Sequence, residues 1–123
     1  MQSKKAIKPL VFIELNEVNF DLVYRAQCNL TFSHPSYTIA PPHIDCDKEH
    51  KVLLYYVNDS DGDTIIYEQT VKDTPCGSVN VDLKEHKRVK PKKGRMVLFD
   101  GYRYHCSSQP KNNYRCIINF DLV

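Results

Sequence analysis

The stretch KVLLYYVNDSDGDTIIYE, Lys51 to Glu68, decides the fold class of this sequence. Two short runs of β-branched, aromatic and other apolar residues enclose a polar segment of aspartate, serine, asparagine and glycine. β-branched and aromatic side chains favour strands, whereas short polar residues and glycine favour turns. The stretch therefore predicts two strands joined by an acidic hairpin turn.

The same pattern extends over most of the chain. From about residue 31 onward, similar short runs are bounded by Pro, Gly, Asn and Asp, and they read SYTIA, SVNVDL, RMVLF and YRCIINFDL. Many short strands separated by turns are typical of a β-sandwich or a β-barrel. We therefore predict one mainly β domain over residues 31–123.

Residues 1–30 differ in character from the rest. VFIEL, beginning at Val11, predicts a short strand. Beyond it, Asn16 can cap a helix, and apolar residues recur at helical spacing at Leu15, Val18, Leu22, Val23 and Ala26. We expect one short N-terminal helix here, and neither a repeat nor a linker marks a further domain boundary.

The composition narrows the classes of partner. With 123 residues, of which 41% are hydrophobic and 26% charged, the chain has the size of one globular domain. A net charge of +2 is too small to predict a nucleic-acid partner. The basic run KEHKRVKPKKGR, Lys84 to Arg95, lacks interleaved aromatic residues and is interpreted as a solvated loop.

No export or membrane signal stands out in the sequence. The apolar runs that begin at Leu10 and Val52 are far shorter than the roughly 20 residues that cross a bilayer. The five cysteines are an odd number and form no C-x-x-C pair, which favours reduced thiols. We expect a cytoplasmic protein without a membrane partner.

A metal-binding pair follows the two prolines Pro41 and Pro42. On an extended segment, residues i and i+2 project to the same side, so His43 and Asp45 could bind one divalent ion while Ile44 faces the core. An H-x-D pair is common by chance, and a third ligand is needed to make the site specific.

The other histidines are the candidates for that third ligand. His105 follows the strand-like run GRMVLFDGYRY and could fold back beside the first pair. His34 precedes a proline in a predicted turn, His50 follows the charged run DKE, and His86 lies in the basic run. We therefore favour His105 and expect His50 and His86 to face solvent.

Two histidines and one aspartate on one side of an ion leave coordination positions open. This arrangement is typical of non-haem Fe(II) that binds a chelating cosubstrate together with dioxygen. A closed structural zinc site would need a fourth protein ligand.

Five segments occur in a characteristic order along the chain. They are HID at His43, LLYYVN at Leu53, DGDTIIYE at Asp61, VKPKKGRMVLFDGYRYH ending at His105, and YRCIINFDL, whose Arg115 follows ten residues later. Together they resemble the prolyl 4-hydroxylase-like branch of the Fe(II)/2-oxoglutarate-dependent oxygenases. The resemblance covers about residue 31 to the C-terminus, and the run before the distal histidine makes it more specific than H-x-D alone.

This resemblance implies a fold and a metal centre. The fold is a double-stranded β-helix, the jelly roll that cupins share, over residues 31–123. The Fe(II) ligands and the catalytic centre are His43, Asp45 and His105.

The resemblance also implies three cosubstrate-binding residues. Arg115 matches the position that binds the distal carboxylate of 2-oxoglutarate, and a planar guanidinium can hold both oxygens of such a group. Tyr56 matches a position whose hydroxyl assists at the same carboxylate, and Tyr37 is expected near the other end of the cosubstrate.

The activity implied is a dioxygenase that uses O2 and 2-oxoglutarate to hydroxylate an unactivated C–H bond, with succinate and CO2 as co-products. Ascorbate is a further candidate cofactor. A peptidyl proline is the favoured substrate, but other protein side chains, free amino acids and other small molecules stay open because fold does not fix substrate.

Two other interpretations stay open. One is a cupin-like metal-binding domain, which normally brings H-x-H and a glutamate, and the other is a non-catalytic jelly-roll binding module. Residues 1–30 match no recognisable part of the family. If a sheet edge is left open, pairing with a second copy would cover it, so a homodimer is one arrangement to test.

Overall fold

The chain folds into two β-sheets. The computed structural model describes residues 10–12, 19–36, 38–76 and 82–123. These residues form no helix, and their strands are β1 (Leu10–Phe12), β2 (Val23–Thr31), β3 (Lys51–Tyr56), β4 (Thr64–Thr70), β5 (Glu85–Val89), β6 (Met96–Asp100), β7 (Arg103–Ser107) and β8 (Arg115–Leu122). The prediction of a mainly β domain is confirmed.

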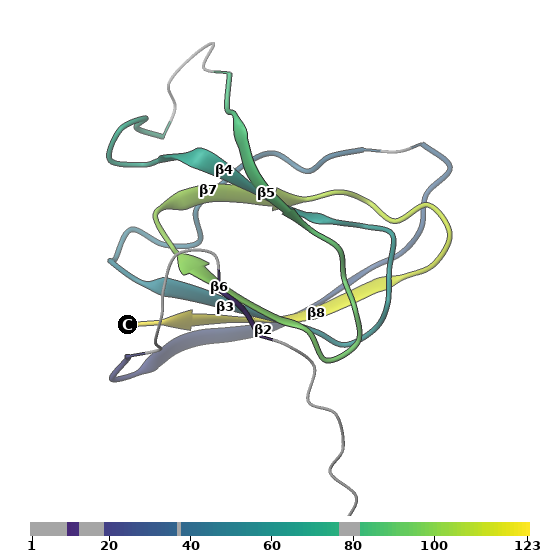
Figure 1. Cartoon of the computed structure of the whole chain (residues 1–123), viewed down its shortest axis with the longest axis horizontal. Coiled ribbons are helices and arrows are strands. Elements are labelled where there is room, and N and C mark those ends of the chain that lie inside the picture. The colour runs from purple at the N-terminus through teal and green to yellow at the C-terminus, as the bar shows by residue number, and fades with distance from the viewer. Residues whose placement is uncertain (1–9, 13–18, 37, 77–81) are drawn as a thin grey trace, which may run out of the picture.

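The two sheets lie one above the other (Figure 1). The larger sheet has the order β1-β6-β3-β8-β2 and the smaller one has the order β5-β4-β7. Paired strands are antiparallel, except for β1 and β6, which run parallel. Consecutive strands such as β3 and β4, or β6 and β7, belong to different sheets, so the chain repeatedly crosses between the layers.

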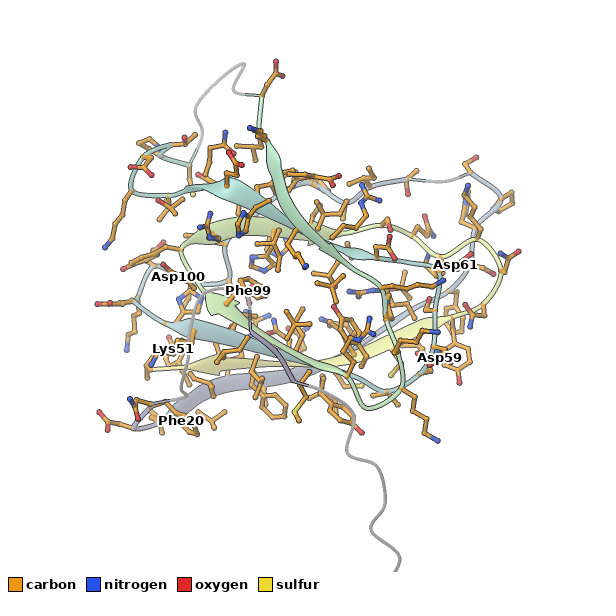
Figure 2. The ribbon with its side chains drawn as sticks, in the orientation of Figure 1. Phe20, Lys51, Asp59, Asp61, Phe99 and Asp100 are labelled. Atoms are coloured by element: carbon orange, nitrogen blue, oxygen red, sulfur yellow. The ribbon has the colours of Figure 1, made fainter. Side chains whose placement is uncertain are left out.

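The main hydrophobic core fills the space between the sheets. Along β3 the side chains alternate, and Val52, Leu54 and Tyr56 are buried. They pack with residues from strands of both sheets, namely Ile66, Val89, Val97, Phe99 and Ile117. Figure 2 shows Phe99 between the two layers. Burial of these apolar side chains is the main force that holds the layers together.

The acidic segment between β3 and β4 is not a hairpin turn, because it leads from one sheet to the other. Its aspartates instead hold neighbouring loops at one end of the sheets (Figure 2). Asp59 Oδ1 accepts a hydrogen bond from the Lys93 amide at 2.7 Å, and Asp61 Oδ1 accepts one from the Lys111 amide at 3.1 Å. The turn composition correctly predicted a break between two strands, but the predicted pairing of these strands in a hairpin is wrong.

The predicted N-terminal helix is wrong where the structure describes it. Val23 and Ala26 lie on β2, and Leu22 precedes that strand without helical structure. Residues Leu15 and Val18 lie outside the described residues. β2 pairs with β8 from Val23 to Thr31, and this ladder of hydrogen bonds outweighs a weak helical periodicity.

The predicted strand at VFIEL is confirmed at its start, since β1 covers Leu10–Phe12. The basic run Lys84–Arg95 is not wholly a loop, because β5 (Glu85–Val89) lies within it and pairs with β4. No helix in the described part of the chain has the length and apolar character to span a bilayer.

Strand β2 has β8 as its neighbour in the larger sheet and lies at the end of the described strand order. Its side chains are mostly exposed, as are several large apolar residues on or beside it: Phe20, Leu22, Val23, Tyr24, Leu30 and Phe32. An edge strand of this kind can pair with another chain. The homodimer stays a prediction.

Gly101, in the turn between β6 and β7, is required by its contact with a buried histidine. A Cβ at this position would lie 2.3 Å from both Cδ2 and Nε2 of His50, whose side chain is buried. We expect Gly101→Ala to lower the free energy of unfolding by about 1–3 kcal/mol, as overpacking of a dense interior usually does. Urea unfolding of the purified variant measures this cost.

The matched control for that prediction is the same substitution made in a His50→Ala background. There the ring is gone, so Gly101→Ala should cost clearly less than it does in the wild-type chain. Equal costs in the two backgrounds would show that the contact with His50 is not the reason for the glycine.

Candidate metal centre

Backbone pairing brings the H-x-D segment beside β7. The amide of His43 donates to the carbonyl of His105 at 3.0 Å, and the amide of His105 donates back to His43 at 3.0 Å. The two imidazole rings then lie 4.7 Å apart between centroids. Asp45, two residues after His43, projects to the same side, and ligand atoms of all three residues lie within 4.8 Å of one another.

The aspartate lies between the two imidazoles. Asp45 Oδ1 is 3.4 Å from His43 Nε2 and 3.2 Å from His105 Nε2. The other ring nitrogen of each histidine faces a backbone carbonyl two residues upstream: His43 Nδ1 is 3.1 Å from Pro41 O, and His105 Nδ1 is 3.1 Å from Arg103 O. Since a carbonyl oxygen only accepts, each Nδ1 carries a proton.

This orientation prepares both histidines to bind a cation. With Nδ1 protonated, the neutral imidazole has its lone pair on Nε2, and a carbonyl that fixes the tautomer is the usual second contact of a metal-bound histidine. Two Nε2 atoms and a carboxylate therefore converge on one point. Protons or a divalent cation can satisfy them, and these donors fit Fe(II).

The electrostatics match this arrangement. Burial is the largest effect on Asp45 and raises its pKa, but the hydrogen bonds with His105 and His43 reverse this and hold the pKa below its ordinary value. The hydrogen bond with Asp45 raises the pKa of His43 above 6.5. Protons therefore compete with a metal for His43 up to a higher pH than for an isolated imidazole.

The centre is buried on one side and open on the other. The side chains of Asp45 and His105 are 5% and 7% exposed, whereas that of His43 is 53% exposed. The ring of Phe99 packs edge-on against His105 with centroids 5.0 Å apart. Asn119 Nδ2 donates to Asp45 Oδ2 at 2.9 Å and so fixes the carboxylate.

A cavity of about 500 Å³ links this centre to Arg115. Both histidines and the arginine line it, and the other lining residues include Thr64, Leu54, Ile117, Asn119, Cys28 and Cys106. Arg115 is only 3% exposed, although it carries a charge that is costly to bury. A buried cation beside a cavity is an attractive site for an anion.

The guanidinium of Arg115 is held in place by neutral groups. Its Nε donates to Gly62 O at 2.9 Å, and one Nη donates to Thr64 Oγ1 at 2.7 Å. Burial lowers the pKa of Arg115, and the charge of Asp63 partly opposes this. Asp63 itself forms an ion pair with Arg88 at 3.8 Å. The positive charge of Arg115 is therefore available to a ligand in the cavity.

The predicted tyrosines are placed differently from the arginine. Tyr56 is fully buried, and its hydroxyl donates to Thr64 Oγ1 at 2.7 Å. Thr64, which lines the cavity, thus stands between Tyr56 and any ligand. Tyr37 lies outside the described residues.

Sequence reasoning missed Thr64 and Asn119, and it misjudged His50. Asn119 could have been found from the alternation of β8, in which Arg115, Ile117 and Asn119 are all buried. His50 was expected to face solvent but is 3% exposed. The neighbouring Lys48 and Glu49 stay at the surface while the histidine ring packs on Gly101, so its charged neighbours were a misleading signal.

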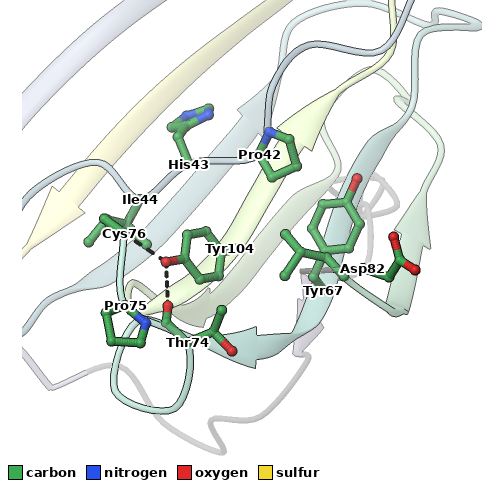
Figure 3. A pocket seen from close by; sticks show the side chains of 10 residues that line it. Pro42, His43, Ile44, Tyr67, Thr74, Pro75, Cys76, Asp82 and Tyr104 are labelled. Carbon is green, nitrogen blue, oxygen red and sulfur yellow. Dashed lines mark hydrogen bonds between the residues drawn. The ribbon is translucent and has the colours of Figure 1, made fainter. Parts of the chain in front are cut away.

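A second cavity of about 540 Å³ also borders His43. Figure 3 shows Pro42, Tyr67, Pro75 and Tyr104 around it. The Tyr104 hydroxyl donates to Thr74 O, so this ring has a fixed position. Most of the residues that line this cavity next to the candidate metal centre are apolar or aromatic, and Thr74 and Asp82 are polar.

Comparisons with protein-family models, with curated proteins and with solved structures found no match to this chain.

Proposed function

We propose that this protein is an Fe(II)- and 2-oxoglutarate-dependent dioxygenase that hydroxylates an unactivated C–H bond. The observation that carries the proposal is the cavity lined both by the histidines of the candidate metal centre and by buried Arg115. The histidines could bind the metal-chelating end of a dicarboxylate cosubstrate, and the guanidinium of Arg115 could bind its other carboxylate. Neither feature alone would favour this cosubstrate.

His43, Asp45 and His105 would hold the ferrous ion. When bound, iron supplies the activation of dioxygen, coupled to decarboxylation of 2-oxoglutarate to succinate and CO2, that such hydroxylation needs. The carbonyl contacts hold the Nδ1 side of both imidazoles and so direct Nε2 toward the ion, and Asn119 fixes the carboxylate. These contacts preorganise the ligands and leave the His43 side accessible.

Arg115 would bind and orient the distal carboxylate of the cosubstrate. Its planar fork suits two carboxylate oxygens, and the low exposure of the site strengthens the interaction. Thr64 accepts hydrogen bonds from both Arg115 and Tyr56, so Tyr56 would act through Thr64 as a positioning residue.

The fold we propose for the two stacked sheets is the double-stranded β-helix, or jelly roll. The support is the crossing of the chain between layers at β3–β4 and β6–β7, with the metal ligands on β7 and on the segment that pairs with it. The substrate would enter from the cavity with Pro42, Tyr67 and Tyr104, which borders His43. Its largely apolar lining suits a peptide or a small molecule, with a peptidyl proline as the first substrate to test.

The test is the absorption spectrum of the iron-loaded protein under anaerobic conditions. Addition of 2-oxoglutarate should produce a visible metal-to-ligand charge-transfer band, which a 2-oxo acid would give if it bound to the Fe(II) of this site. Succinate, which lacks the keto group, should produce none and is the matched control. Folded protein with bound iron and an unchanged spectrum would contradict the proposal and favour a metal-binding jelly-roll module without this activity.

A further inference from the structure

A second group of metal-ligating side chains lies next to the first and shares Asp45 with it. One ligand atom from each of Asp45, His50 and Asp121 lies within 4.8 Å of the others. His50 is 3% exposed and Asp121 is 1% exposed, so this group is more deeply buried than His43. Asp121 is two residues from Asn119 on β8 and faces inward with it.

Three polar atoms of this group are unsatisfied. Both carboxylate oxygens of Asp121 and the Nε2 of His50 are shielded from solvent, and no hydrogen-bond donor or acceptor of the described residues reaches them. A buried carboxylate normally accepts hydrogen bonds, because burying it without a partner costs a free energy of roughly several kcal/mol. Asp121 therefore requires a positive partner.

The nearest acidic group makes that requirement stronger. Ligand atoms of Asp45 and Asp121 lie within 4.8 Å of each other, and two carboxylates this close disfavour a second negative charge. One occupant that would relieve this repulsion is a proton shared by the pair. The other is a cation between them.

The histidine favours the cation. His50 Nδ1 lies 2.6 Å from Lys48 O, two residues upstream, which repeats the contacts of His43 with Pro41 and of His105 with Arg103. Cys46 Sγ also lies 3.3 Å from this Nδ1, but the shorter contact with the carbonyl favours a proton on Nδ1, which leaves Nε2 with an unused lone pair. Gly101 packs against this ring, since a Cβ there would be 2.3 Å from Cδ2 and Nε2, and so holds the ring in place. A shared proton alone would not need this orientation.

We propose that Asp45, His50 and Asp121 form a second divalent-cation site, so that the centre binds two metal ions with Asp45 as the shared ligand. Two carboxylates and one imidazole suit Mn²⁺, Fe²⁺ or Zn²⁺. The second ion neutralises the buried carboxylates and anchors the strand β8, which also carries Arg115 and Asn119. The site stands on its own residues and does not require the oxygenase activity.

The experiment counts metal ions per chain with Mn²⁺ as the probe. Chelator-treated protein is dialysed against Mn²⁺, and bound manganese is measured by mass spectrometry against protein concentration. Wild-type protein should bind two ions, and Asp121→Asn, which keeps the side-chain volume, should bind one. Asp47→Asn, a change of the same kind at an exposed aspartate between Asp45 and His50, should keep two.

Two further variants separate this proposal from the proposed function. His43→Ala removes a ligand of the first site alone, so it should bind one ion. The second site would be overturned, and the first retained, by the following result: wild type binds one ion, Asp121→Asn also binds one, and His43→Ala binds none. A stoichiometry unchanged by His43→Ala would count against the first site instead.

Spectroscopy and folding give independent readouts. Two manganese ions that share a carboxylate should give a spin-coupled electron paramagnetic resonance spectrum, and Asp121→Asn should restore the six-line spectrum of a single ion. Without metal, Asp121→Asn should unfold at the same temperature as wild type or higher, because a buried like charge is removed. If Asp121→Asn does not fold, His50→Gln takes its place with the same expected loss of one ion. A wild-type spectrum of isolated ions at saturation would overturn the proposal.

Discussion

His105→Ala should reduce Fe(II) affinity at the first site by about 100-fold or more and abolish 2-oxoglutarate turnover. Loss of a group that merely orients a metal ligand costs about 10–100-fold in affinity, and loss of the ligand itself should cost at least as much. Among the proposed ligands of the first site, His105 and Asp45 are the two buried side chains, so water cannot readily replace the nitrogen of His105. Iron titration and succinate formation measure the two effects.

The matched control is His86→Ala, which removes an exposed histidine from β5. It should retain iron affinity and turnover. His105→Gln serves if the alanine variant is unstable, because glutamine preserves most of the side-chain volume and leaves Asp45 a hydrogen-bond donor. Wild-type iron affinity in a folded His105 variant would mean that the three residues do not form the metal centre.

Arg115→Lys should raise the 2-oxoglutarate concentration needed for the charge-transfer band by about 100-fold while the iron content stays unchanged. Lysine keeps the positive charge but cannot offer two parallel N–H donors. Disrupting a buried charge pair typically costs about 2–5 kcal/mol, and a 100-fold change in Kd corresponds to about 3 kcal/mol. Anaerobic titration with 2-oxoglutarate measures the shift.

Arg88→Lys is the control for this prediction, because Arg88 is partly exposed and its side chain pairs with Glu85 on β5. It should bind 2-oxoglutarate as wild type does. Unaltered cosubstrate binding by Arg115→Lys, in protein shown to be folded and iron-loaded, would remove Arg115 from the cosubstrate site. The metal centre would be unaffected by that result.

The strands and the candidate ligands could be read from local patterns. Alternating β-rich runs identified β3, β4, β6 and β8, because side-chain alternation along a strand depends on neighbours in sequence. The spacing of His43 and Asp45 likewise guarantees a shared side on extended backbone. The third residue, His105, was selected by its context at the end of a strand, and the structure brings it to the pair.

The errors arose where long-range contacts compete with local preference. Val23 and Ala26 have helical spacing, but β8 offers a partner along the whole of β2, and the ladder prevails. His50 has charged neighbours, but its ring fits against Gly101, fifty-one residues away in sequence. Neither partner can be inferred from a window of adjacent residues.

Local patterns in the chain were sufficient for the β class, and the alternation of β8, in which Arg115, Asn119 and Asp121 are buried, is also a local pattern. Local patterns do not show that β3 and β4 belong to different sheets, that His43 pairs with His105, or that Asp121 lies beside Asp45; these follow from the fold of the whole chain. The reason is physical. Strand periodicity is a property of neighbouring residues, whereas the pairing of distant strands depends on which arrangement of the whole chain buries its apolar side chains and satisfies its backbone hydrogen bonds.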